Sequence, residues 1–356
     1  MRALHWPAAS LMVVVIISGL AFAGYTSRQI RTQVDLVVVP VGVRDSEGRL
    51  VTGLQAEDFS VLEDGKPQRI SNFSLDPIPL SAVILIDDGM SRTMLRRLYP
   101  YPPVLPSPLI TFTSGFSEFD EAASFRYDHS IYRLADFANN PFAIEESFRE
   151  IAQIAETRPD DPADMLAEKG PGWLRSILNV LGGGGDGGRP SATPGMPPPS
   201  PRANPRPSNR LMHDAIHDAA LALQSRPANR RRIIVVISDG KDIGSTHTLA
   251  ENTDLLLNQE IQFYAVSMSF ATFGSFGLLS DYARATGGDA YPGTSTTSLE
   301  TAFNQITEQA RNQYILGYVS NNTAGESAVF RKIEVRMRSP KHKANYSKGY
   351  MQYPKR

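Results

Sequence analysis

The sequence predicts an α/β protein with a doubly wound, mostly parallel central sheet. Two apolar runs rich in Val and Ile, residues 81–86 and 233–237, each end abruptly in acidic and small polar residues, which is typical of buried parallel strands. Stretches with helical periodicity at 211–223, 248–259 and 299–311 alternate with strand-like runs. This alternation favours a parallel sheet covered by helices on both faces.

Segments of β character flank the α/β region. In residues 34–78, an Asp64-Gly65 pair between strand-like arms at 59–62 and 68–73 predicts a tight hairpin. Residues 313–356 return to β character with alternating apolar side chains. Because neither segment is long enough to bury a sheet alone, we expect the two to form one β-sandwich, with the α/β domain of residues 80–312 inserted between them.

Two further segments belong neither to the expected α/β domain nor to the expected β-sandwich. Residues 1–23 have the pattern of a secretory signal peptide, with an apolar stretch from Ala8 to Ala23 and a small-residue cleavage site. The alternative is an uncleaved anchor, although the stretch is shorter than the roughly 20 residues that span a bilayer. Both interpretations place the folded part outside the cytoplasm, whether periplasmic, secreted or on the cell surface. Residues 157–208 are rich in Pro and Gly and predict a disordered insertion.

Within that insertion, the apolar stretch at residues 173–181 predicts either a transient helix packed on the body of the protein or a motif that docks to a partner.

Composition excludes several classes of function. The chain of 356 residues has no cysteine, which excludes disulfides, thiolate metal sites and thiol catalysis. The formal net charge is −1, so nothing in the charge balance favours nucleic acid or an anionic membrane surface as a partner.

Acidic residues follow the two apolar runs at equivalent places. Asp87 and Asp88 follow the first run, and Asp239 follows the second. Ligand sites in open α/β sheets lie beyond the carboxyl ends of the strands. Two strands that both end in carboxylates favour a binding module rather than an enzyme.

A series of short motifs runs through the chain in a fixed order. They include Val41-Gly42-Val43-Arg44-Asp45, Leu54-Gln55-Ala56-Glu57-Asp58-Phe59, Glu63-Asp64-Gly65-Lys66-Pro67, Ser238-Asp239-Gly240, Ala285-Thr286-Gly287-Gly288, Gln313-Tyr314-Ile315-Leu316-Gly317-Tyr318 and Lys348-Gly349-Tyr350. On these motifs the α/β region resembles a von Willebrand factor A (VWFA) domain, and residues 34–353 as a whole resemble the von Willebrand factor A-related family first described in acidobacteria. The resemblance implies a secreted or surface protein of poorly known function that binds other proteins and has no catalytic activity.

The resemblance also implies a metal site, which this chain retains only in part. Such domains use an Asp-x-Ser-x-Ser loop, a Thr from a second loop and an Asp from a third. Asp87, Ser91 and Asp239 match, whereas Gly89 replaces the middle Ser and Arg210 stands where the Thr is expected.

Three interpretations of the site follow. In the first, Asp87, Ser91 and Asp239 hold Mg²⁺ or Mn²⁺ weakly. In the second, no metal binds, because the planar guanidinium of Arg210 lies between Asp87 and Asp239 and replaces the cation. In the third, the two aspartates only cap a helix and a turn.

His213 and His217 support an alternative function, that of an enzyme rather than a binding module. They stand four residues apart on one predicted helix, as in zinc proteases, and predict a zinc-dependent hydrolase. The more ordinary interpretation is a solvated helix face, with Met212, Ile216 and Ala219 on the buried side.

We therefore expect a non-enzymatic module for protein or extracellular-matrix binding, with no nucleic-acid partner and membrane contact only through an uncleaved N-terminus. A third expectation is an assembly component with a vestigial site. The expected binding residues are Asp87, Asp88, Gly89, Ser91, Arg210 and Asp239.

Overall fold

The computed structural model describes residues 36–75, 77–98, 112, 115–140, 144–146, 148–151, 153, 209–269, 275–322 and 325–354. The predicted signal peptide and the Pro/Gly-rich insertion at 157–208 lie outside these residues. None of the helices in the described part combines the length and the apolar character that crossing a membrane requires.

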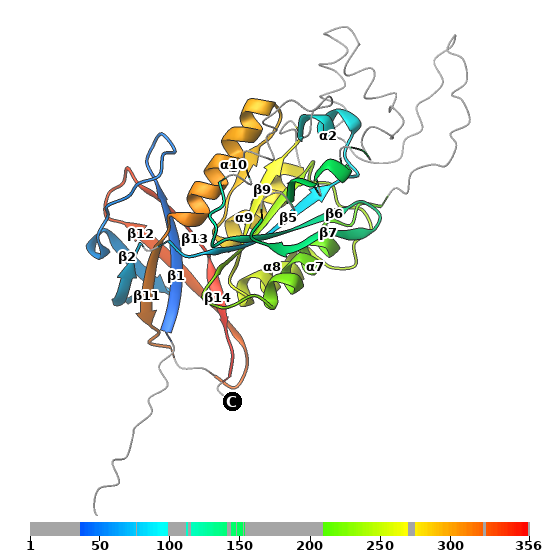
Figure 1. The fold of residues 1–356 in the computed structure, drawn as a ribbon. Coiled ribbons are helices and arrows are strands. Elements are labelled where there is room, and N and C mark those ends of the chain that lie inside the picture. The colour runs from blue at the N-terminus through cyan, green and yellow to red at the C-terminus, as the bar shows by residue number, and fades with distance from the viewer. Residues whose placement is uncertain are drawn as a thin grey trace, which may run out of the picture. The chain divides into compact units, whose positions relative to one another are not determined.

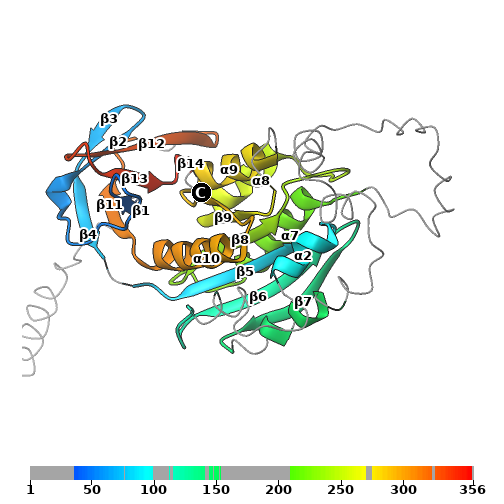
Figure 2. The same ribbon diagram turned by 90° about the horizontal axis from the view of Figure 1, so that it is seen from above.

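The α/β region contains one mixed six-stranded sheet. Five strands run parallel and the sixth, β7, runs antiparallel to β6 at one edge. Figure 2 shows most of this row, with β9, β8, β5, β6 and β7 side by side. In sheet order the strands are β10 (Ala290–Pro292), β9 (Ile261–Ser267), β8 (Arg231–Ser238), β5 (Leu80–Asp87), β6 (Glu121–Tyr127) and β7 (Ile131–Ala138).

Helices cover both faces of this sheet, as the alternating sequence pattern predicts (Figure 1). The side chains of β5 and β8 alternate between two cores: Ile84 and Val235 join one, and Leu85 and Val236 join the other. Both strands therefore contain an uninterrupted apolar stretch, residues 82–86 in β5 and 233–237 in β8. The first core packs on α2 (Arg92–Leu98) and α10 (Thr296–Arg311), and the second on α7 (Met212–Gln224), α8 (Leu249–Asn258) and α9 (Ser275–Thr286).

The remaining strands form two four-stranded antiparallel sheets that mix the two ends of the chain. β1 pairs with β11 and β13, and β2 pairs with β12. Apolar side chains of both sheets, including Val41, Phe59 and Val335, belong to one buried cluster. The first sheet is β13 (Lys343–Tyr346), β1 (Leu36–Arg44), β11 (Tyr314–Val319) and β4 (Ile70–Ser74); the second is β14 (Gly349–Gln352), β12 (Val329–Met337), β2 (Phe59–Glu63) and β3 (Lys66–Gln68).

The predicted hairpin requires a correction. The turn is present, with φ of 49° at Asp64 and 79° at Gly65, as a two-residue primed turn requires. The second arm, however, is divided between two sheets: β3 pairs with β2, whereas β4 pairs with β11. The two-residue turn sets Lys66 opposite Glu63, so the return strand begins two residues earlier than predicted. Sequence reasoning also missed the edge strand β7.

Candidate functional site

Neighbouring strands bring the two predicted aspartates to one edge of the sheet. β5 and β8 run parallel with Ile86 opposite Ile237, so the chain leaves both strands at the same level. Asp87 is fully buried and Asp239 is 3% exposed.

Arg210 reaches the same place from the segment that precedes α7. Its backbone forms an isolated two-residue bridge with Ile243, with both N···O distances at 2.8 Å. This bridge ties the entry to α7 to the loop that follows Asp239. The expected helix start is thus nearly correct, since α7 begins at Met212 and buries Met212, Ile216 and Ala219.

The guanidinium of Arg210 lies between the two aspartates. Its Nη1 atom is 2.9 Å from Asp87 Oδ2 and 3.3 Å from Asp239 Oδ1. Only 17% of the Arg210 side chain is exposed. A single guanidinium nitrogen therefore contacts one oxygen of each carboxylate, which is the arrangement that the second interpretation of the site describes.

Gly89 makes room for this arginine. A Cβ atom at position 89 would lie 2.5 Å from Arg210 Nε and 2.7 Å from Arg210 Cδ, closer than Cβ atoms come to other heavy atoms. A serine at position 89 would therefore force the Arg210 side chain to move from this position. The two departures from the Asp-x-Ser-x-Ser pattern and its partner Thr are thus in direct contact in the structure.

Burial dominates the electrostatics of Asp87. Burial, opposed by the charge of Arg210, raises the pKa of the Asp87 carboxyl to about 7. Ser238 Oγ donates to Asp87 Oδ2 at 2.8 Å and accepts from Tyr127 Oη at 3.0 Å. Asp87 Oδ1 has no hydrogen-bond partner in the described part of the chain.

The other carboxylates of the site also face basic side chains. Asp88 Oδ2 lies 2.6 Å from Arg126 Nη1, and Asp239 Oδ2 lies 3.3 Å from Lys241 Nζ. With Arg210, each of the three aspartates therefore has a basic side chain within ion-pair distance. The chain itself balances the negative charge that a divalent cation would otherwise balance.

The residues present do not fit a divalent cation while Arg210 holds this position. Mg²⁺ requires about six oxygen ligands in near-octahedral geometry. The Oγ of Ser91 accepts from Met94 N at 3.3 Å and forms no hydrogen bond with Asp87 or Asp239. Over the described ranges, no group of three or more His, Cys, Asp or Glu side chains could hold a metal ion.

Comparisons with known proteins give a likeness only to solved structures. No protein-family model matches the chain, and no curated protein matches it. BatB from Bacteroides thetaiotaomicron is 12% identical, with a TM-score of 0.38 over 65% of this chain and 98% of that one. The SpRpn10 VWA domain is 13% identical, with a TM-score of 0.34 over 64% of this chain and 95% of that domain.

Proximal thread matrix protein 1 from the mussel byssus is 9% identical, with a TM-score of 0.42 over 70% of this chain and 51% of that chain. The interpretation of the site in this protein therefore rests on the site's own geometry.

The two histidines of the zinc alternative contact different neighbours. His213 Nδ1 is 2.7 Å from Tyr282 Oη, whereas His217 Nδ1 is 3.2 Å from Asn252 Oδ1. The ring of His217 stacks on His247, with 3.7 Å between ring centroids. Nothing in the described residues joins the histidines into a metal-binding set.

Sequence reasoning missed four side chains at the site: Arg126, Tyr127, Ser238 and Lys241. Arg126 and Tyr127 are the last two residues of β6, and the run of small and apolar residues in the sequence, 122–125, ends before them. Ser238 stands in the quoted Ser-Asp-Gly motif, but its hydroxyl contact with Asp87 becomes visible only when β5 and β8 are neighbours.

Proposed function

We propose that this chain is a non-enzymatic protein-interaction module that binds its partner through the loops at the carboxyl ends of β5 and β8, with an arginine in place of a metal ion. This loop face consists of Asp87, Asp88, Gly89, Ser91, Arg210 and Asp239. The observation that carries the proposal is the position of Arg210 Nη1, 2.9 Å and 3.3 Å from the two aspartates.

Physical chemistry supports a permanent substitution. A buried carboxylate pair without a counter-charge is strongly unfavourable, and breaking a buried ion pair costs about 3–5 kcal/mol. Mg²⁺ would have to expel the guanidinium, and it would gain only part of its octahedral shell. The module therefore presents to its partner a loop face whose carboxylates are already paired with basic side chains, and it needs no metal to do so.

The wider setting is part of the same proposal. The chain is a von Willebrand factor A-related protein outside the cytoplasm, and its α/β domain is inserted into a β-sandwich built from both chain ends. The pairing of β1 with β11 and of β2 with β12 supports this division. An assembly component with a vestigial site presents the same loop face, and the two interpretations differ only in whether a partner binds there.

Thermal unfolding with and without millimolar Mg²⁺ or Mn²⁺ tests the arginine substitution. We compare the parent chain with Arg210→Thr and with Gly89→Ser/Arg210→Thr, which restores the full ligand pattern. The parent should show no metal-dependent shift in Tm. The double variant should be stabilised by about 2.7 kcal/mol when the metal is at 100 times its Kd, because the metal binds only the folded state.

Lys241→Thr is the matched control. It also removes a cation from Asp239, but the Lys241 side chain is 52% exposed and does not lie between the carboxylates. It should gain no metal response. A metal-dependent rise in Tm of the parent chain would sink the proposal, and so would a double variant that folds but ignores both metals.

A further inference from the structure

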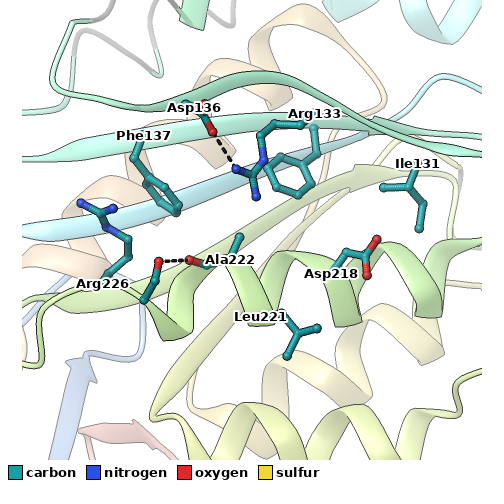
Figure 3. Close-up of a pocket in the computed structure, with 10 residues that line it drawn as sticks. Ile131, Arg133, Asp136, Phe137, Asp218, Leu221, Ala222 and Arg226 are labelled. Carbon is teal, nitrogen blue, oxygen red and sulfur yellow. Dashed lines mark hydrogen bonds and ion pairs between the residues drawn. The ribbon is translucent and has the colours of Figure 1, made fainter.

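A groove lies between the edge strand β7 and helix α7, and the loop-face proposal does not use it. Its volume is about 650 Å³. Figure 3 shows β7 on one side and α7 on the other, with side chains of both elements pointing into the space between them. The lining residues are Phe125, Ile131, Arg133, Asp136, Phe137, Asp218, Leu221, Ala222, Ser225 and Arg226.

The groove offers apolar surface that the described chain leaves open. Ile131 and Phe137 of β7 point into the space between the two elements, and Leu221 on α7, which is 46% exposed, lies at its border. Two arginines lie over aromatic rings at the groove: Arg133 Cζ is 4.9 Å from the centroid of Phe125, and Arg226 Cζ is 4.7 Å from that of Phe137. A ligand that covers Leu221 and the half-buried Phe137 gains hydrophobic contact.

Among the described residues that line the groove, one acidic side chain has no basic partner. Arg133 Nη1 pairs with Asp136 at 2.7 Å, and Arg226 forms two bonds of 2.8 Å with Glu121. Asp218, exposed on α7, has no ion pair or hydrogen bond in the described part of the chain. The complementary ligand is a peptide segment with one basic side chain among apolar ones.

The chain contains such a segment, and we propose that residues 171–183 occupy this groove. They lie outside the described residues, and their sequence, Pro-Gly-Trp-Leu-Arg-Ser-Ile-Leu-Asn-Val-Leu-Gly-Gly, has Arg175 as its only charged residue. Arg175 pairs with Asp218, while Trp173 and the neighbouring leucines and isoleucine cover the apolar lining.

Chain connectivity permits this contact. The described chain resumes at Asn209, three residues before α7, whose second half lines the groove. The 25 residues from 184 to 208 reach up to about 85 Å when extended, whereas α7 is only about 20 Å long. Because the segment is tethered, its effective concentration at the groove is on the order of millimolar, so a weak contact suffices.

Tryptophan fluorescence of the full chain tests the proposal. The sequence has two tryptophans, so Trp6→Phe leaves Trp173 as the sole reporter. In this background Trp173 should emit at short wavelength and resist quenching by acrylamide. Asp218→Arg should shift the emission to longer wavelength, because it sets a like charge against Arg175. Adding Arg175→Asp should restore the original emission by exchanging the two charges.

Asp254→Arg is the matched control, since it reverses an exposed acid on the neighbouring helix α8 and should leave Trp173 unchanged. The cysteine-free chain offers a second measurement: Leu178→Cys with Leu221→Cys should form a disulfide under mild oxidation, and Leu178→Cys with Asp254→Cys should not.

A water-exposed Trp173 in the parent overturns the proposal and leaves the groove to another molecule. A buried Trp173 that does not respond to Asp218→Arg also overturns it, because the segment then packs elsewhere.

Discussion

The protonation of Asp87 is subject to opposing effects. Its carboxyl group receives a hydrogen bond from Ser238 and an ion pair from Arg210, and both favour the charged form. Removal from water favours the neutral form and outweighs them, so its pKa rises to about 7. A titratable group of this kind makes stability depend on pH.

The sign of that dependence is opposite to that of an ordinary salt-bridged aspartate. Between about pH 4 and pH 7 the folded chain keeps the proton on Asp87, whereas the unfolded chain, in which the pKa of this carboxyl is 3.8, has lost it. The Asp87 contribution to the free energy of unfolding should therefore be greatest below pH 4 and fall as the pH rises from about 4 to about 7.

Asp87→Asn keeps the shape of the side chain and removes the titration. Urea unfolding across this pH window should show that the parent loses stability relative to the Asn variant as pH rises, with Asp254→Asn as the control. Parallel pH profiles for the parent and Asp87→Asn would contradict the buried-carboxyl account.

Helix α7 shows how an element is fixed by a distant loop. Leu211 at its N-cap position offers no capping side chain, and Asp242 from the loop after β8 accepts from His213 N at 2.9 Å instead. Ser245 Oγ donates to the same carboxylate oxygen. This contact stands beside the Arg210–Ile243 bridge, so one loop positions both the helix start and the arginine.

Asp242→Ala should cost about 1 kcal/mol, as the loss of a capping residue does. Asp242→Asn, which keeps an oxygen acceptor, should cost less. Chemical denaturation measures both, and Asp254→Ala on the exposed face of α8 serves as the reference. Equal stability of the Ala variant and the parent would show that the helix end does not need this carboxylate.

At the scale of the whole molecule, a buried carboxylate links the two ends of the chain. Glu63 on β2 is fully buried and accepts from Tyr318 Oη at 2.7 Å and from Ser320 Oγ at 2.6 Å. Burial, together with this contact, raises the pKa of Tyr318 well above its usual value. The residues of this cluster are 255 to 257 positions apart in sequence.

Glu63→Ala should therefore lower the free energy of unfolding by about 1–3 kcal/mol, because it leaves buried hydroxyl groups without an acceptor. Glu63→Gln should be milder. If the chain ends hold the molecule together, urea unfolding should stay a single transition at a lower midpoint. A separate early transition would instead show that the strands from the chain ends unfold independently of the α/β region.

The sequence by itself determined the local features of this protein. The apolar runs that end in Asp87 and Asp239 predict buried parallel strands, the Asp64-Gly65 pair predicts its turn, and the periodicity of α7 predicts which face is buried. These follow from the side chains of a few consecutive residues. The replacement of Ser by Gly89 and of Thr by Arg210 was also visible in sequence, as two separate departures from a motif.

Only the tertiary structure decided what those departures mean together. Gly89 and Arg210 are 121 positions apart, and the room that Gly89 leaves for Arg210 appears only once the fold brings the two together. The same reason hid Arg126 and Tyr127, because the length of β6 depends on its neighbour β5. The division of the predicted hairpin arm between two sheets was hidden in the same way, because β4 pairs with β11, which is far away in sequence. Short-range patterns cannot specify such partners, because the contacts that select them are long-range.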